Sequence, residues 1–243
     1  MSRDRSHTGG SPSTPEYNRR PMPAASPIPA RTFAVLAAVF ATITMGAARP
    51  ASGQIVEPLR GVVVDARGAL ATFPDEAAIA DPRGLDAASL PGRGLGLEVG
   101  AHVYPVRWKA ITFGFGASLV WARGSATAPV TDGGAPSPEA TTRFSAVSPQ
   151  LSLNFGSGRG WSTLSAGLGW ASLTVSRTDQ PDEPGDAVAT LHYGGGARWL
   201  FSRHLGASFD LRFYQLGERA PSAASPGPPK MTRFVTTVGL SIK

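Results

Sequence analysis

The fold is decided by residues 94–104, which read GLGLEVGAHVY and alternate between apolar and small or polar residues. One face of this stretch carries Leu95, Leu97, Val99, Ala101 and Val103. The other face carries Gly94, Gly96, Glu98, Gly100, His102 and Tyr104. Because successive side chains of a strand point to opposite faces, this alternation predicts a β-strand with one apolar side.

The same alternation recurs along the chain without any helical stripe. It predicts eight strands at 59–70, 94–104, 110–122, 147–155, 161–177, 189–201, 205–214 and 232–243. Within 161–177 the apolar positions shift from the face of Leu168 and Trp170 to that of Leu173 and Val175. That shift predicts either a β-bulge or the end of an apolar band.

The connections between these strands alternate in length. The long ones cover about 73–92, 124–141, 178–188 and 218–230, and the short ones about 105–109, 156–160 and 202–204. In an up-and-down barrel this order places every long loop at one end, as in outer-membrane barrels. The sequence therefore predicts an all-β fold, an eight-stranded antiparallel up-and-down transmembrane β-barrel.

Three features indicate that the apolar face points outward. The polar face is rich in Gly and Ser, which suits the crowded interior of an eight-stranded barrel. The apolar faces carry almost no charge, which a lipid-facing surface requires. Aromatic residues flank each short connection and are expected to form an interfacial girdle, namely Tyr104, Trp108, Phe155, Trp161, Trp199 and Phe201.

On this strand pattern and girdle, and on segments such as HYGGGARWLFSRHLGASFDLR at 192–212, the chain resembles the small eight-stranded outer-membrane β-barrels, of the kind formed by the OmpA transmembrane domain. The resemblance covers about 57–243. It implies a place in the bacterial outer membrane, surrounded by outer-membrane lipid, and insertion by the outer-membrane assembly machinery. Barrels of this type usually end in an aromatic residue, whereas this sequence ends in Ser241, Ile242 and Lys243. We therefore expect a divergent assembly signal or a truncated end.

The first 53 residues are expected to be a leader with a signal peptide, and 54–243 the barrel domain. The apolar run FAVLAAVFATITMGAA at 33–48 has the length of a signal h-region and is short for a membrane span. Cleavage after Ala48 or after Gly53 fits the small residues that follow, and Met22 is an alternative start. A single N-terminal membrane anchor and twin-arginine export through Arg19 and Arg20 are the other interpretations.

Charge and composition exclude several functions. The 243 residues carry a net charge of +6, but six Arg and only two acidic residues lie in 1–53, so the barrel domain has no basic stripe for nucleic acid. The absence of Cys excludes disulfides and thiolate chemistry. The four His show no metal-ligand spacing, and no Ser is placed to be the nucleophile for His192, since Ser172 and Ser176 lie only in the neighbouring strand. We expect no catalytic, cofactor or metal site.

The lumen is expected to hold nine polar side chains, namely Asp65, Arg67, Glu98, His102, Gln150, Asn154, Arg198, Asp210 and Arg212. The three acidic residues and three Arg among them balance in charge, and buried charges must be paired. This predicts a structural salt-bridge network centred on Asp210 and Arg212. A gate or proton path is the alternative role.

The sequence thus favours an integral outer-membrane protein with a structural or surface-interaction role, four long extracellular loops and a side-chain-filled lumen. A narrow solute channel and a soluble periplasmic lipocalin-like ligand-binding barrel are the alternatives. The loops carry no aromatic-rich or charge-rich signature that would identify an extracellular partner.

Overall fold

The computed structural model describes residues 59–73, 77–127, 138–180, 185–221 and 226–243. The chain divides into two units, Met1–Pro50 and Ala51–Lys243, and every described residue belongs to the second. The expected leader, its apolar run and both cleavage sites therefore lie outside the described residues. The first five residues of the expected barrel domain, 54–58, also lie outside them.

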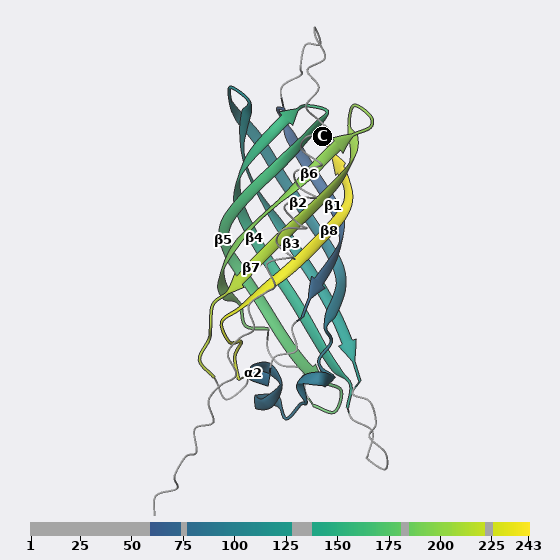
Figure 1. Ribbon diagram of the computed structural model, residues 1–243, viewed down its shortest axis with the longest axis vertical. Helices are drawn as coiled ribbons and strands as arrows, with labels where there is room; N and C mark the ends of the chain where they lie inside the picture. The colour runs from purple at the N-terminus through teal and green to yellow at the C-terminus, as the bar shows by residue number, and fades with distance from the viewer. Residues whose placement is uncertain (1–58, 74–76, 128–137, 181–184, 222–225) are drawn as a thin grey trace, which may run out of the picture. The chain divides into compact units, whose positions relative to one another are not determined.

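Eight antiparallel strands close into one barrel (Figure 1). They are β1 (Val62–Thr72), β2 (Arg93–Trp108), β3 (Ile111–Ala126), β4 (Ala140–Ser157), β5 (Gly160–Arg177), β6 (Val188–Leu200), β7 (Leu205–Leu216) and β8 (Met231–Ile242). Each strand pairs with the next along the chain, and β1 pairs with β8 from Val64 opposite Ile242 to Ala71 opposite Val235. The predicted fold class is confirmed.

The apolar faces of the strands point outward, as the composition of the two faces predicts. Leu95, Leu97 and Leu168 are among the most exposed side chains, whereas Asp65 and Asn154 are buried. A lipocalin-like barrel has the opposite arrangement, with its apolar face lining the cavity. The lipocalin-like interpretation is therefore wrong.

The two strands that flank the second long connection are longer than predicted. β3 continues to Ala126 and β4 begins at Ala140, so the connection predicted at 124–141 shortens to 127–139. The pattern shift in β5 is the end of the apolar band, because the register with β4 runs unchanged from Ala140 opposite Arg177 to Ser157 opposite Gly160. The outward face becomes polar at Ser172, while Leu173 and Val175 continue the inward face.

A bulge that the sequence did not predict lies in β2. Its register with β3 shifts between Val103, opposite Phe115, and Val106, opposite Phe113. An extra residue in one strand reverses which side chains face outward beyond it. Val106 and Trp108 are therefore exposed, although Tyr104 is buried. β2 also continues through most of the turn predicted at 105–109 and ends at Trp108.

The long-loop end of the barrel is filled by an apolar core. Between β1 and β2 the chain forms the short helix α2 (Ala77–Ala80) and the 3-10 helices η1 (Asp81–Arg83) and η2 (Ala87–Ser89). Ile79, Leu85 and Leu90 of this segment join one buried cluster with inward side chains of the barrel, among them Phe144 and Leu173. Figure 1 shows α2 at that end of the barrel. Among the described residues no helix is long and apolar enough to span a membrane.

Hydrogen bonds hold residues 77–90, here called the capping segment, in place. Arg177 at the end of β5 donates to the carbonyl oxygens of Arg83 and Gly84, both at 3.4 Å. Arg83 donates to the carbonyl oxygen of Ile79 at 2.7 Å, and Asp86 caps η2 by accepting from the amide of Ala88 at 2.9 Å. Residues 77–90 of the first long connection are therefore a packed part of the barrel end.

Truncation of Phe144 tests whether this core stabilises the barrel. The ring is 2% exposed and packs edge-on against Tyr214, with the ring centroids 5.3 Å apart. We expect Phe144→Ala to lower the free energy of unfolding by about 3–5 kcal/mol, as for buried aromatic residues in general. Urea unfolding of the protein in detergent micelles measures this loss. The outward Leu168→Ala is the control, and an equal loss in both variants would contradict a packed core at this end.

Candidate functional site

The barrel interior is the most polar buried region of the molecule. The six charged residues expected to form a network all lie on inward faces, each no more than 3% exposed: Asp65, Arg67, Glu98, Arg198, Asp210 and Arg212. They come from β1, β2, β6 and β7, which closure brings around one narrow lumen. His102, Gln150 and Asn154 are buried on the same inner surface.

Asp65 is the residue on which most of these contacts converge. Its carboxylate accepts two hydrogen bonds from Arg198, at 3.0 Å from Nε and 2.6 Å from Nη2. It also forms an ion pair with Arg67 at 2.5 Å and accepts from the hydroxyl of Ser241 at 2.5 Å. The ring of His102 lies 3.4 Å away. Asp65 of β1 thus connects to β2, β6 and β8.

Glu98 extends the Asp65 group, and Asp210 and Arg212 form a separate pair. Arg67 also pairs with Glu98, at 3.2 Å between Nη1 and Oε2. Arg212 pairs with Asp210 at 3.1 Å and donates to the hydroxyls of Ser118 and Ser165 at longer range. The expectation that Asp210 and Arg212 form the centre is therefore wrong. Asp210 and Arg212 pair because they lie two residues apart on the same face of β7. Asp65 is the centre because it contacts side chains from three other strands.

Uncharged side chains complete the interior. The amide of Gln150 lies 2.6 Å from Nε2 of His102. Asn154 accepts from Thr163 at 2.8 Å and donates to the carbonyl oxygen of Thr112 at 3.0 Å. These bonds join β2 to β4, and β4 to both of its neighbours. Buried polar side chains are favourable where such partners exist.

The sequence analysis missed Arg233 of β8. Its side chain is 1% exposed and faces the lumen, with Nη2 2.6 Å from the sulfur of Met231. The expected balance of three acidic residues against three Arg is therefore incomplete, because a fourth Arg lies inside. The alternation of 232–243 already set Arg233 opposite the outward Phe234, so the period-two pattern carried the signal.

The predicted aromatic girdle is wrong for two of its six members. Trp108, Phe155, Trp199 and Phe201 face outward, with Trp108 59% exposed. Tyr104 and Trp161 are each only 3% exposed. They face inward because their positions in β2 and β5 have the parity of His102 and Thr163. Their rings pack edge-on, 5.9 Å apart between centroids, in a small apolar cluster with Leu59, Val63 and Leu200 at the short-turn end.

The apolar exterior also has a boundary toward the long-loop end. Trp121 is the last outward apolar residue of β3 and is followed on that face by Arg123. Trp170 is the last in β5 and is followed by Ser172. Amphipathic rings favour the level between hydrocarbon and headgroups. An apolar band with tryptophans at both of its ends is typical of the exterior of a membrane-spanning barrel.

In the part of the chain that the structure describes, the histidines singled out by the sequence lie apart from the serines near His192. His192 is fully buried in the lumen, and its Nε2 lies 2.9 Å from the carbonyl oxygen of Pro149. Ser172 lies on the opposite, outer face of the barrel wall, and His204 lies in the last short turn. Within the described ranges, no three His, Asp or Glu side chains lie close enough together to hold a metal ion.

No protein-family model and no curated protein matches the chain. Among solved structures it is similar to Neisserial surface protein A, with 14% identity over 75% of this chain and 95% of that one and a TM-score of 0.45. It is also similar to Ail, the attachment invasion locus protein of Yersinia pestis, with 9% identity, coverage of 76% and 98%, and a TM-score of 0.46. A third similar structure is the outer membrane protein OprG of Pseudomonas aeruginosa, with 11% identity over 78% of this chain and 98% of that one and a TM-score of 0.43. Likenesses at this level imply nothing about the role of the chain.

Removal of Asp65 tests the lumen network. Asp65→Ala leaves Arg198 and Arg67 without the carboxylate that they share, and breaking a buried ion pair typically costs about 3–5 kcal/mol. We expect Asp65→Ala to lose more free energy of unfolding than Asp210→Ala. Among the contacts described above, the Asp210 carboxylate pairs with Arg212 alone, whereas the Asp65 carboxylate pairs with two arginines. Urea unfolding in micelles compares the two. Adding Arg198→Ala to Asp65→Ala should recover part of the loss, and wild-type stability of Asp65→Ala would refute the network.

Proposed function

We propose that the chain is an integral protein of the bacterial outer membrane with a structural or surface-interaction role and no enzymatic activity. The observation that carries this proposal is the closed barrel with an apolar exterior and a charged, buried interior. A closed barrel satisfies all backbone hydrogen bonds between its own strands, so it can reside in hydrocarbon without an open edge. Barrels of this kind belong to outer membranes.

The filled interior supports a structural role over a solute channel. Charged side chains occupy the middle of the lumen, where Asp65 and Arg198 reach each other across the barrel. The apolar core that includes Phe144 and the capping residue Ile79 fills the long-loop end, and the Tyr104–Trp161 cluster fills the other end. An eight-stranded barrel is just wide enough for side chains to fill its interior. Activity in this molecule therefore belongs to its outer surface and its loops.

Heat modifiability in the outer-membrane fraction tests the proposal. A closed barrel resists SDS in the cold because its strands have no free edge, so the unboiled protein should migrate faster than the boiled chain. The protein should also sediment with the outer membrane. A soluble periplasmic protein without a shift would overturn the proposal.

Thiol labelling of intact cells tests the orientation, and the chain has no Cys to interfere. Glu218 follows β7 in a long connection and Arg203 lies in a short turn, and both side chains are exposed. We expect Glu218→Cys to react with a membrane-impermeant maleimide on intact cells. Arg203→Cys should react only after the outer membrane is permeabilised. The reverse pattern would show that the long loops face the periplasm.

A further inference from the structure

The short-turn end of the barrel carries charged side chains of one sign. Its described residues are 59–61, 105–110, 156–160, 201–204 and 243, and none of these is Asp or Glu. The Arg and Lys residues among them are Arg60, Arg107, Lys109, Arg159, Arg203 and Lys243. Protein surfaces usually intersperse charges of both signs, and a field of one sign draws molecules of the opposite charge toward it. This end of the barrel therefore favours an anionic partner.

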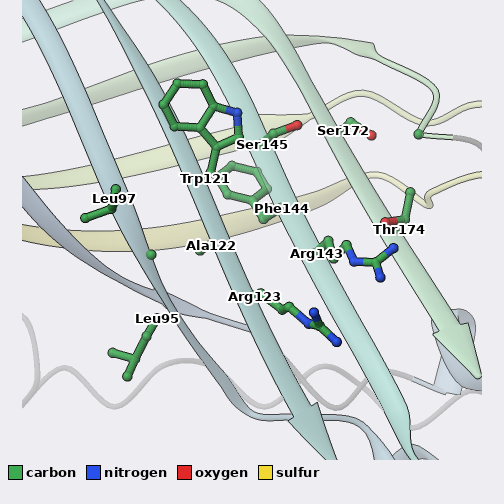
Figure 2. Close-up of a pocket in the computed structure, with 12 residues that line it drawn as sticks. Leu95, Leu97, Trp121, Ala122, Arg123, Arg143, Phe144, Ser145, Ser172 and Thr174 are labelled. Atoms are coloured by element: carbon green, nitrogen blue, oxygen red, sulfur yellow. The ribbon is translucent and has the colours of Figure 1, made fainter. Parts of the chain in front are cut away.

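The long-loop end has no such bias. The acidic residues described there are Asp81, Asp86, Glu139, Asp179, Asp186 and Glu218. Arg177 pairs with Asp179 at 2.7 Å. Figure 2 shows Arg123 and Arg143 on the outer wall toward that end, beside Trp121. These arginines belong to an end of mixed charge, so the single-sign field is a property of the short turns.

Four segments of the short-turn end surround one surface pocket. They are the residues before β1, the β4–β5 turn, the β6–β7 turn and the residue after β8. Their basic side chains in the pocket lining are Arg60, Arg159, Arg203, His204 and Lys243. Closure brings these segments together, because β8 pairs with both β1 and β7. Basic residues that are far apart in the sequence therefore converge on one concave site.

Hydrogen bonds between the segments fix the shape of the pocket. Lys243 donates from its amide to the carbonyl oxygen of His204 at 2.9 Å and from Nζ to that of Gly158 at 3.4 Å. The amide of Leu200 donates to the carbonyl oxygen of Arg159 at 2.8 Å. The β4–β5 and β6–β7 turns are thus held together before any ligand binds. A preorganised site loses less conformational entropy on binding.

Three guanidinium groups of the pocket are available to a ligand. Arg60, Arg159 and Arg203 are exposed, and none of them pairs with an acidic side chain in the described part of the chain. Guanidinium groups bind carboxylates in a bidentate manner. Arg203 lies in the turn beyond the outward Trp199 and Phe201, which mark the interfacial level on this side. The pocket therefore faces the aqueous compartment, where carboxylates of soluble partners are found.

We propose that this pocket binds an acidic peptide segment of a partner protein on the short-turn side of the membrane. Carboxylates of the segment pair with Arg60, Arg159 and Arg203, and Lys243 adds positive charge at the pocket. The assignment rests on the proposed function, which places the short turns in the periplasm. It gives the barrel an interaction site on the side opposite to its long loops.

The test measures the fluorescence anisotropy of a labelled oligoglutamate peptide added to the full chain folded in uncharged detergent micelles. We expect saturable binding that weakens with added salt. Arg159→Gln combined with Arg203→Gln should weaken binding by about tenfold or more, because two charge-assisted contacts are lost. The corresponding Lys pair should fall in between, since lysine retains the charge but not the bidentate geometry. Arg107→Gln with Lys109→Gln is the charge-matched control at the same end but outside the pocket, and it should bind nearly as wild type does.

Three results would overturn the site. Equal weakening in the control pair would show a diffuse field without a pocket. Equal binding of an oligoglutamine peptide would show that carboxylates are not recognised. Displacement of the peptide by phosphatidylglycerol at the same concentration would assign the arginines to lipid headgroups.

Heat modifiability of every variant is measured alongside, so that the two proposals fail separately. Loss of the heat shift in the wild type would refute the membrane barrel itself. An intact shift with unchanged peptide binding in the Arg159 and Arg203 glutamine pair would refute only the peptide site.

Discussion

The rest of the structure depends on the hydrogen bonds between backbone amides and carbonyls of neighbouring strands around the whole barrel. Hydrocarbon offers no water to satisfy these groups, so a sheet within it cannot leave an open edge. The pairing of β1 with β8 meets that requirement, because it joins the two strands that would otherwise form the edges. Closure in turn fixes which side chains face the lumen. Every outward residue meets the surroundings and every inward residue must find partners in a narrow interior.

Asp65 shows how closure and the polar interior support each other. It lies opposite Ser241 at the seam between β1 and β8, and the two side chains are hydrogen-bonded. It also pairs with Arg198 from the far side of the barrel. A carboxylate this deeply buried is favourable only with such partners. The same contacts therefore both satisfy the charge and join the first and last strands, and a chain with β8 detached would leave Asp65 with fewer of them.

The sequence alone was enough to predict the features that depend only on the alternation of side chains between the two faces of each strand. The strands, the outward apolar face and the inward placement of residues such as Glu98 and Arg212 follow from alternation, and Arg233 could have been placed in the same way. Contacts between distant strands depend on register, so the central role of Asp65 was beyond the pattern. The alternation did not place the bulge in β2, although Pro105 inside the strand was a signal for it, because proline within a sheet is confined to edges and bulges. The capping segment was read as a loop because its helices are only three or four residues long.

The placement of arginine in this barrel follows a single rule about solvation. Inside the lumen, Arg67, Arg198 and Arg212 are buried but have carboxylates within ion-pair distance. On the outer wall, Arg123 and Arg143 appear only beyond the last tryptophan of β3, where headgroups and water begin. The outward face between Phe113 and Trp121 carries no charge. A guanidinium group there would have neither a carboxylate nor a phosphate to contact, and that cost explains why the positive charges of the described barrel wall lie in the lumen or at its rims.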